Sequence, residues 1–384
     1  MNHDPEVLFM QRKNTHFFLF IITSGILPAL QACSNGELPT ALAPPQELYA
    51  PFIANEQDLP VLDGRREEAA WKSAPVYRVF LNNQNGGVNL PARGILTEWQ
   101  AVWWRVIVKI TPVNSTRSDT AFASHVGIVV TWPDADKNLD PQPWSYDPAT
   151  ATWSQNRQGV DWLLITWPTA AVHLDLWFWD AARTNPMGYF QDMVLEGMIE
   201  GNRVVPLHVA IDGLNFFNDR DSLRNTWDAN YNDNNTPRDS SDDRPRWAWK
   251  DDPEMTPPPL PPVYSSRDEN RRFLLDSVAV LLAQSAYANP RTAVAVPGAV
   301  LQRPAGSAAD IRAFGRHENG RWTLEFVRRA KASDGHDVVL NPTARYFSQS
   351  LAVALGNNAA TPFDRAAAPF NIDNSLMLSF EFRR

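Results

Sequence analysis

The feature of this chain that most constrains its fold is a succession of short segments rich in β-branched and aromatic residues. Clusters of glycine, proline, asparagine and aspartate separate these segments, as turns separate strands. Residues 173–180 place Asp175, Trp177 and Trp179 on one face, and Asn319-Gly320 is typical of a tight hairpin turn. The pattern predicts an all-β fold, a sandwich or a barrel. The expected strands are residues 77–81, 103–110, 125–132, 160–167, 173–180, 322–329 and 375–382.

Two stretches interrupt the strand pattern. Residues 271–286 are the main helical candidate, although a buried strand explains the same apolar run equally well. Residues 212–262 are dominated by Asn, Asp, Arg and Ser, which indicates a functional or a disordered loop inserted into the domain. The Asp-x-Asn-x-Asn spacing from Asp228 mimics the start of a calcium loop, but Asp233 stands where that loop needs glycine. We therefore expect a solvated loop there.

The first residues of the chain have the pattern of an export signal. Arg12 and Lys13 precede an apolar run over residues 17–30, which is short of the roughly 20 residues that cross a bilayer. The sequence Leu-Gln-Ala-Cys-Ser then places Cys33 as in the lipobox of bacterial lipoproteins, which it resembles. The alternative is an ordinary secretory signal with an incidental cysteine.

The lipobox resemblance implies three parts of the chain. These are a signal peptide over residues 1–32, a flexible Pro- and Ala-rich tether over residues 33–60, and one folded domain over residues 61–384. Cys33 would carry the lipids and anchor the protein in a membrane. Ser34 favours the outer membrane, so we expect an outer-membrane or periplasm-facing lipoprotein of the cell envelope.

Composition excludes several function classes. The chain has 384 residues, a formal net charge of −8 and no cluster of basic residues, which argues against nucleic-acid binding. Cys33 is the only cysteine, so a disulfide, a thiolate metal ligand, a cysteine nucleophile and a Cys-x-x-Cys-His haem attachment are excluded. Hydrolase and phosphate-loop motifs are absent from the sequence. We expect the adjacent acids to lie on solvated faces; these are Glu67-Glu68, Asp242-Asp243 and Asp251-Asp252. We therefore predict that the chain is not itself an enzyme.

Several blocks of sequence together carry a resemblance to a known family. They are VLDGRREEAAWKSAP, HVGIVVTWPDADKN, LDLWFWDAARTNPMGYFQD, GRWTLEFVRRAKASDGHDVVLNP and YFSQSLAVALGNNA. In order and spacing they resemble the haem-binding domain related to the γ subunit of ethylbenzene dehydrogenase, which also occurs in cytochrome c-552 and in DMSO reductase-like proteins. The resemblance covers residues 62–382, and its Trp-x-Trp…Ala-Arg-Thr-Asn-Pro block is the most specific part.

The resemblance implies a β-sandwich with immunoglobulin- or DOMON-like layers, long irregular loops and few short helices. It also implies one haem b between the sheets and electron transfer with a periplasmic redox enzyme or a c-type cytochrome. Haem requires an apolar slot, axial ligands and cations for its propionates. This chain departs from the family at the ligands, because relatives often read Trp-His-Trp-Lys where it has Trp177-Phe178-Trp179-Asp180. A His or Lys that relatives often carry after the Asn-Asn strand is also missing from residues 362–366.

The remaining candidates for a haem site are weighed by residue type. His173 and Met187 are the candidate iron ligands, with strand and packing roles as their alternatives. Arg183 and Arg328 are candidates for the propionates, with pairing to aspartates as the alternative. Trp177 and Trp179 would wall the ligand or belong to the core. Weaker candidates are His125, Met193, Met198 and Lys331 as ligands, Arg329 for a propionate and Trp322 as a wall.

Two other functions remain open at this point. One is a non-haem binding module for carbohydrate or another ligand, since the Leu-Asp-Gly…Trp opening also occurs in a family of carbohydrate-binding modules and the chain has 15 tryptophans. The other is a ligand-free adaptor that keeps the fold alone.

Overall fold

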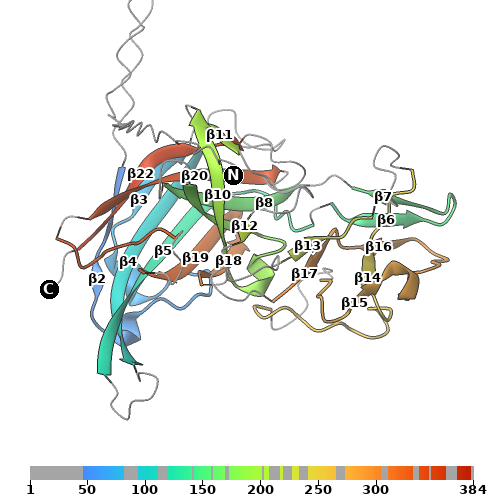
Figure 1. Cartoon of the computed structure of the whole chain (residues 1–384), viewed down its shortest axis with the longest axis horizontal. Helices are drawn as coiled ribbons and strands as arrows, with labels where there is room; N and C mark the ends of the chain where they lie inside the picture. The colour runs from blue at the N-terminus through green and yellow to red at the C-terminus, as the bar shows by residue number, and fades with distance from the viewer. Residues whose placement is uncertain are drawn as a thin grey trace, which may run out of the picture. The chain divides into compact units, whose positions relative to one another are not determined.

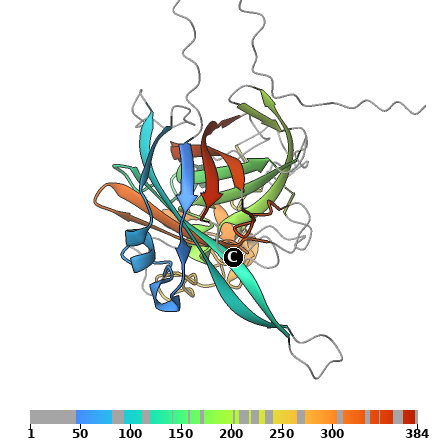
Figure 2. The ribbon, with the colours of Figure 1, turned by 90° about the vertical axis from the view of Figure 1, so that its left-hand side faces the viewer.

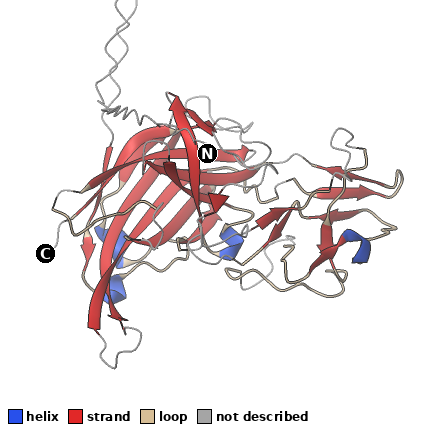
Figure 3. Cartoon of the chain, viewed as in Figure 1, coloured by secondary structure: helices blue, strands red, loops and turns tan. Residues whose placement is uncertain are grey.

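Two large β-sheets form the main body of the protein (Figures 1 and 2). The computed structural model describes residues 46–381 except 82–93, 111–118, 141, 157–158, 169–172, 201–202, 207–216, 219–226, 233–240, 265–272, 304–309, 332–336, 346 and 360–369. Strands account for most of the regular structure (Figure 3), so the predicted all-β, sandwich-like fold is confirmed. Among the described residues, no helix has the length and apolar character needed to span a bilayer.

The first large sheet has the strand order β1-β22-β20-β8-β9-β10-β11-β21, with β12 paired to β10. Its strands are β1 Gln46–Ala50, β8 Val160–Pro168, β9 His173–Asp180, β10 Gln191–Glu200, β11 Arg203–Pro206, β12 Phe217–Asn218, β20 Ser348–Ala359, β21 Phe370–Asn371 and β22 Asp373–Phe380. The second has the order β18-β19-β5-β4-β2, with β3 paired to β4. Its strands are β2 Phe52–Ile53, β3 Tyr77–Leu81, β4 Ile95–Ile110, β5 Asp119–Pro133, β18 Arg312–Glu318 and β19 Arg321–Arg329.

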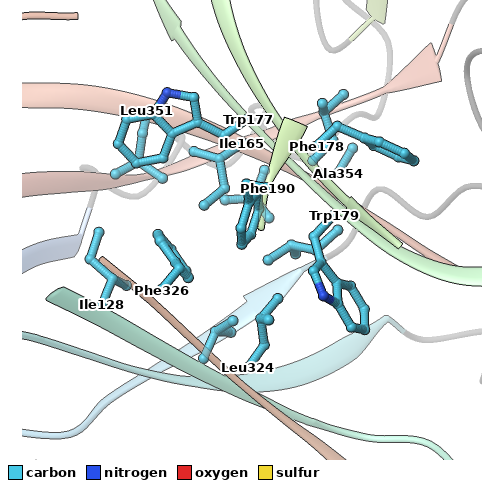
Figure 4. Packing of buried hydrophobic residues seen from close by; sticks show 14 of the residues in the cluster. Ile128, Ile165, Trp177, Phe178, Trp179, Phe190, Leu324, Phe326, Leu351 and Ala354 are labelled. Atoms are coloured by element: carbon cyan, nitrogen blue, oxygen red, sulfur yellow. The ribbon is translucent and has the colours of Figure 1, made fainter. Parts of the chain in front are cut away.

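The core lies between these two sheets and is rich in tryptophan. Trp177 and Trp179 of β9 meet Phe326 and Trp322 of β19 edge to face, with ring centroids 6.2 and 5.1 Å apart. Figure 4 shows the side chains of both sheets packed against one another. Burial of so many large apolar rings supplies the main driving force for this fold. The hairpin predicted at Asn319-Gly320 is confirmed, since both residues have positive φ and join β18 to β19.

A side lobe of three small sheets is built from segments that lie far apart in the sequence. One sheet has the order β16-β6-β7, and the other two pair β14 with β15 and β13 with β17. The strands are β6 Trp144–Asp147, β7 Thr152–Gln155, β13 Trp227–Ala229, β14 Trp247–Trp249, β15 Ala279–Leu281, β16 Val294–Val296 and β17 Ala299–Leu301. The lobe has its own apolar cluster around Trp144, Trp249 and Leu274. The short helices of the described residues are α1 Ala69–Ser73, η1 Glu56–Asp58, η2 Asn185–Met187 and η3 Leu282–Gln284.

Three predictions about chain organisation need correction. The tether does not extend to residue 60, because β1 pairs in parallel with β22 and β2 with β4, and Leu48 and Ala50 are fully buried. Of the two interpretations of residues 271–286, the helix is wrong for the described part, which holds the short strand β15 and the single turn η3. The polar insertion over residues 212–262 is not wholly irregular, because Trp227 and Trp249 bury their rings and carry β13 and β14 into small sheets.

The three residues of the calcium-like spacing make contacts within the protein. Asp228 accepts a hydrogen bond from Gln302, at 2.7 Å. The buried Asn230 donates to the carbonyls of Trp247 and Pro297. Asn232 pairs through its backbone with Arg244. These contacts explain the Asp-x-Asn-x-Asn sequence without an ion.

Candidate functional site

Arg328 lies at the centre of a buried charged cluster between the sheets. It projects from β19, is 2 % exposed, and its guanidinium makes ion pairs at 2.8–3.4 Å. The partners are Asp175, Asp192, Asp310 and Asp337. Although burial alone would lower the pKa of Arg328, these carboxylates raise it above its usual range. Burial raises the pKa of Asp175, and Arg328 opposes that rise. The guanidinium of Arg328, a candidate for binding a haem propionate, is therefore already paired with aspartates.

Arg183 is held in the same way at a second position. It follows β9, forms a buried ion pair through Nε with Asp180, and lies 4.0 Å over the ring of Trp227. The indole Nε1 of Trp227 donates to Gln191, at 2.9 Å. A guanidinium that is both paired and stacked is a structural element of this corner.

Met187 lies beside Arg183, in the single turn η2. It is 8 % exposed and belongs to an apolar cluster with Tyr189, Trp227, Phe273, Leu275 and Leu301. The hollow beside it, lined by Arg183, Phe273 and Leu301, has a volume of about 20 Å³. That volume holds about one water molecule and is far below the size of a ligand site. The Met187 side chain packs within the apolar cluster.

The other nominated residues are distributed over the fold. His173 begins β9 opposite Glu196, and its side chain lies outside the described part of the structure, as do Cys33 and the Met198 side chain. The ring of His125 stacks on Trp104 with centroids 5.6 Å apart, and burial lowers the pKa of its imidazole. Met193 is in the main core, and Lys331 and Arg329 are exposed. Trp322 donates from Nε1 to Asp161, at 3.1 Å.

The described residues do not fit a haem at the place that the resemblance implied. Trp177 and Trp179 pack directly against the facing sheet, Met187 packs within an apolar cluster, and both arginines are paired with aspartates. Pockets for cofactors and drug-sized ligands usually measure about 300–1,000 Å³. Two hollows in the described part of the chain, one lined by side-lobe residues and one at the corner of Arg183, lie outside the space between the large sheets.

The larger hollow is a cleft of about 710 Å³ in the side lobe. Trp249 and Tyr287 lie beneath it, with ring centroids 6.1 Å apart, and the Tyr287 hydroxyl donates to Asp252 Oδ1 at 3.3 Å. The polar residues that line it are Asp140, Ser145, Asp252, Glu254, Asn289, Arg291 and Thr292. Three carboxylates against one guanidinium make the cleft acidic, and its hydroxyls and amides suit a small polar ligand.

Sequence reasoning did not find this cleft. Asp251-Asp252 was expected to lie on a solvated face, and Asp251 is indeed exposed, but Asp252 turns toward Tyr287. The one indication in the sequence was that apolar residues, including Trp249 and Tyr287, stand on either side of a polar stretch. It could not show that segments near residues 140, 250 and 290 meet, because this depends on long-range contacts: β6 pairs with β16, and Tyr287 contacts Trp249 and Asp252.

Comparison with known proteins identifies the family of this chain. The model of the ethylbenzene dehydrogenase family matches residues 164–362, about half of the chain. The matched part includes β9, β19 and the side-lobe strands β13 to β17, but it starts after β6 and β7 and stops before β22. A search of curated proteins finds no match.

Proposed function

This chain belongs to the ethylbenzene dehydrogenase family, and we propose that it is a non-catalytic binding protein of the cell envelope that takes a small polar ligand in the cleft of its side lobe. The observation that carries the proposal is the contrast between the two candidate places. The space between the large sheets is filled by tryptophans, whereas the side lobe has an open cleft of about 710 Å³.

The chemistry of the cleft selects the class of ligand. Asp252 accepts from the Tyr287 hydroxyl and from the amide of Glu254, so its carboxylate is held in one orientation. Carboxylates outnumber the guanidinium of Arg291, which favours neutral or cationic ligands over anions such as a haem propionate. A neutral sugar offers many hydroxyls to such groups, so a carbohydrate is the ligand class we propose.

Lipid anchoring completes the proposal. The export signal and the Leu-x-Ala-Cys sequence support attachment through Cys33, with the domain outside the cytoplasm. Lipid chains on Cys33 would hold the cleft near the membrane surface, where a bound ligand could be retained.

Electron transfer through a bound haem b is the second candidate, and the family match favours it. It requires iron ligands that the described residues do not bring together, such as His173 with a partner from the undescribed segments. A redox enzyme or a c-type cytochrome would then be the partner. The described contacts of Met187, Arg183 and Arg328 support the first proposal over this one.

One preparation tests both candidates. The full-length chain is produced in cells supplied with haem, purified in detergent, and examined by visible spectroscopy and by calorimetric titration with cellobiose, xylobiose and maltose. We expect no Soret band and saturable binding of at least one disaccharide. Asp252→Asn should weaken that binding about tenfold or more, because a charge-assisted hydrogen bond is lost. Asp251→Asn, at the exposed neighbouring position, is the matched control and should leave the binding unchanged.

The opposite result is equally clear. A stoichiometric Soret band without disaccharide binding would overturn the cleft proposal in favour of electron transfer, and His173→Ala would then be the first variant to compare by its spectrum. A folded protein that lacks both properties would contradict both candidates.

A further inference from the structure

Three carboxylates from distant parts of the sequence meet on the second large sheet, outside the cleft. Asp63 and Glu68 lie in the segment that leads into α1, and Glu325 lies in the middle of β19. One carboxylate oxygen of each lies within 4.8 Å of the others. The sites discussed above use none of these residues.

Glu325 has a buried carboxylate oxygen that lacks a hydrogen-bond partner among the described residues. Its side chain is fully buried, and its Oε2 accepts hydrogen bonds from the amides of Gly64 and Asp63, at 2.7 and 3.0 Å. Its Oε1 is buried without a hydrogen-bond partner, and so is Oε2 of Glu68. Burial raises the pKa of Glu325 to about 7, the two amides act against this rise, and the charges of Glu68 and Asp63 add to it.

A comparison with the Arg328 cluster shows what is unusual here. Both clusters gather three carboxylates whose oxygens lie close together. In the first, Arg328 supplies the positive charge that Asp175, Asp192 and Asp337 need. In the second, the ion pairs of the described residues include none to Asp63, Glu68 or Glu325. Buried carboxylates without a cation repel one another, which is costly unless an ion or a proton intervenes.

We propose that Asp63, Glu68 and Glu325 form a binding site for a calcium ion. The ligand set consists of carboxylate oxygens only, which are the donors that hard divalent cations prefer. Oxygens that bind one calcium ion at about 2.3–2.6 Å lie up to about 5 Å apart, which accommodates the observed separation. Magnesium demands a smaller and more regular octahedron, so calcium fits this cluster better.

The ion would tie the start of the domain to its core. Residues 63–68 connect η1 with α1, and Glu325 already holds their backbone through two amides. A calcium ion bound to Oε1 of Glu325 and to Glu68 would add a second attachment of this segment to β19. The inference is independent of the ligand in the cleft and of haem.

The experiment is a calcium titration of the full-length chain in detergent after removal of metal ions with EDTA. Calorimetry should show saturable binding of CaCl₂ in a 1:1 ratio and weaker binding of MgCl₂. The unfolding temperature should rise by several degrees in 1 mM CaCl₂, because only the folded state has the site. Glu68→Gln should weaken calcium binding roughly tenfold or more, since the number of charged ligands sets affinity in such sites.

The variants also separate the ion from a shared proton. Glu67→Gln, at the exposed neighbouring position, is the matched control and should bind calcium like the unmodified chain. In EDTA, Glu68→Gln should unfold at the same or a higher temperature than the unmodified chain, because it relieves repulsion and breaks no hydrogen bond found among the described residues. This keeps the test valid if Glu325→Gln fails to fold. The proposal would be overturned if the titration showed no heat of calcium binding and CaCl₂ left the unfolding temperature unchanged. That result would favour a proton shared between Glu325 and Glu68.

Discussion

At the scale of single residues, Arg328 shows how a buried charge serves the fold. Its guanidinium contacts four aspartates and lies 5.0 Å from the ring centroid of Trp177. Arg328→Met keeps the apolar stem and removes the charge, leaving the carboxylates uncompensated. We expect a loss of about 3–5 kcal/mol in the free energy of unfolding at pH 7, measured by urea denaturation.

Arg329 is the control for that prediction, because it follows Arg328 in the same strand but is exposed. Arg329→Met should change the free energy of unfolding by no more than about 0.5 kcal/mol. The loss for Arg328→Met should also shrink at pH 5, where the native state takes up protons on the freed carboxylates. Equal effects of the two substitutions would contradict a structural role for the Arg328 cluster.

At the scale of elements, a polar junction joins strands of both sheets. Asp134, just after β5, accepts from the side-chain amide of Asn357 in β20, at 2.9 Å. Asp161 in β8 accepts from the amide of Asn358 and from the indole of Trp322. Burial raises the pKa of Asp134 to about 7, with repulsion from Asp161 adding to it, and raises that of Asp161 to about 6.

These raised values predict how stability depends on pH. Between pH 4 and pH 7 the native state binds more protons on these carboxyls than the unfolded state, so their contribution to stability falls as pH rises. Asp134→Asn should therefore remove this fall. Compared with the unmodified chain, the variant should gain more free energy of unfolding at pH 8 than at pH 5, by up to about 1.4 kcal/mol for each pH unit within that window. Urea denaturation at both values measures this change. Asp251→Asn, at an exposed position, is the control and should change the free energy of unfolding equally at pH 5 and pH 8. An equal change at the two pH values for Asp134→Asn would refute the predicted titration.

At the scale of the whole molecule, the proposed lipid anchor decides where the domain acts. If Cys33 carries acyl chains, the chain should fractionate with membranes and incorporate labelled palmitate, since each buried CH₂ group adds about 0.8 kcal/mol of membrane affinity. Cys33→Ser should abolish the label and release the protein, whereas Ser34→Ala should keep it. Unlabelled, soluble protein in all three cases would instead indicate an ordinary signal peptide.

Much of the fold could be predicted because strands repeat with a period of two residues. The alternation of Trp322, Leu324 and Phe326 located β19, and the turn at Asn319-Gly320 located its hairpin. The pattern failed where pairing depends on distant partners. Residues 46–53 have little periodicity, yet β1 and β2 add to the edges of both large sheets.

The candidate site was harder to predict than the fold. Residue type singled out Arg183, Arg328 and Trp177 as candidates for a haem site, but it could not distinguish a group facing a cofactor from one already paired. Adjacent acids were expected to lie on solvated faces, yet one member of two such pairs turns inward, Glu68 toward Glu325 and Asp252 toward Tyr287.

The sequence by itself determined the strand segments, the hairpin and the relation to the ethylbenzene dehydrogenase family, because each depends on residues close together in the chain or in a fixed order. Only the tertiary structure decided that Arg328 belongs to four aspartates, that the tryptophans fill the space between the sheets, and that the cleft lies in the side lobe. Those features depend on which side chains, distant in the sequence, come into contact in the interior. There the cost of burying a charge depends on the partner that it meets.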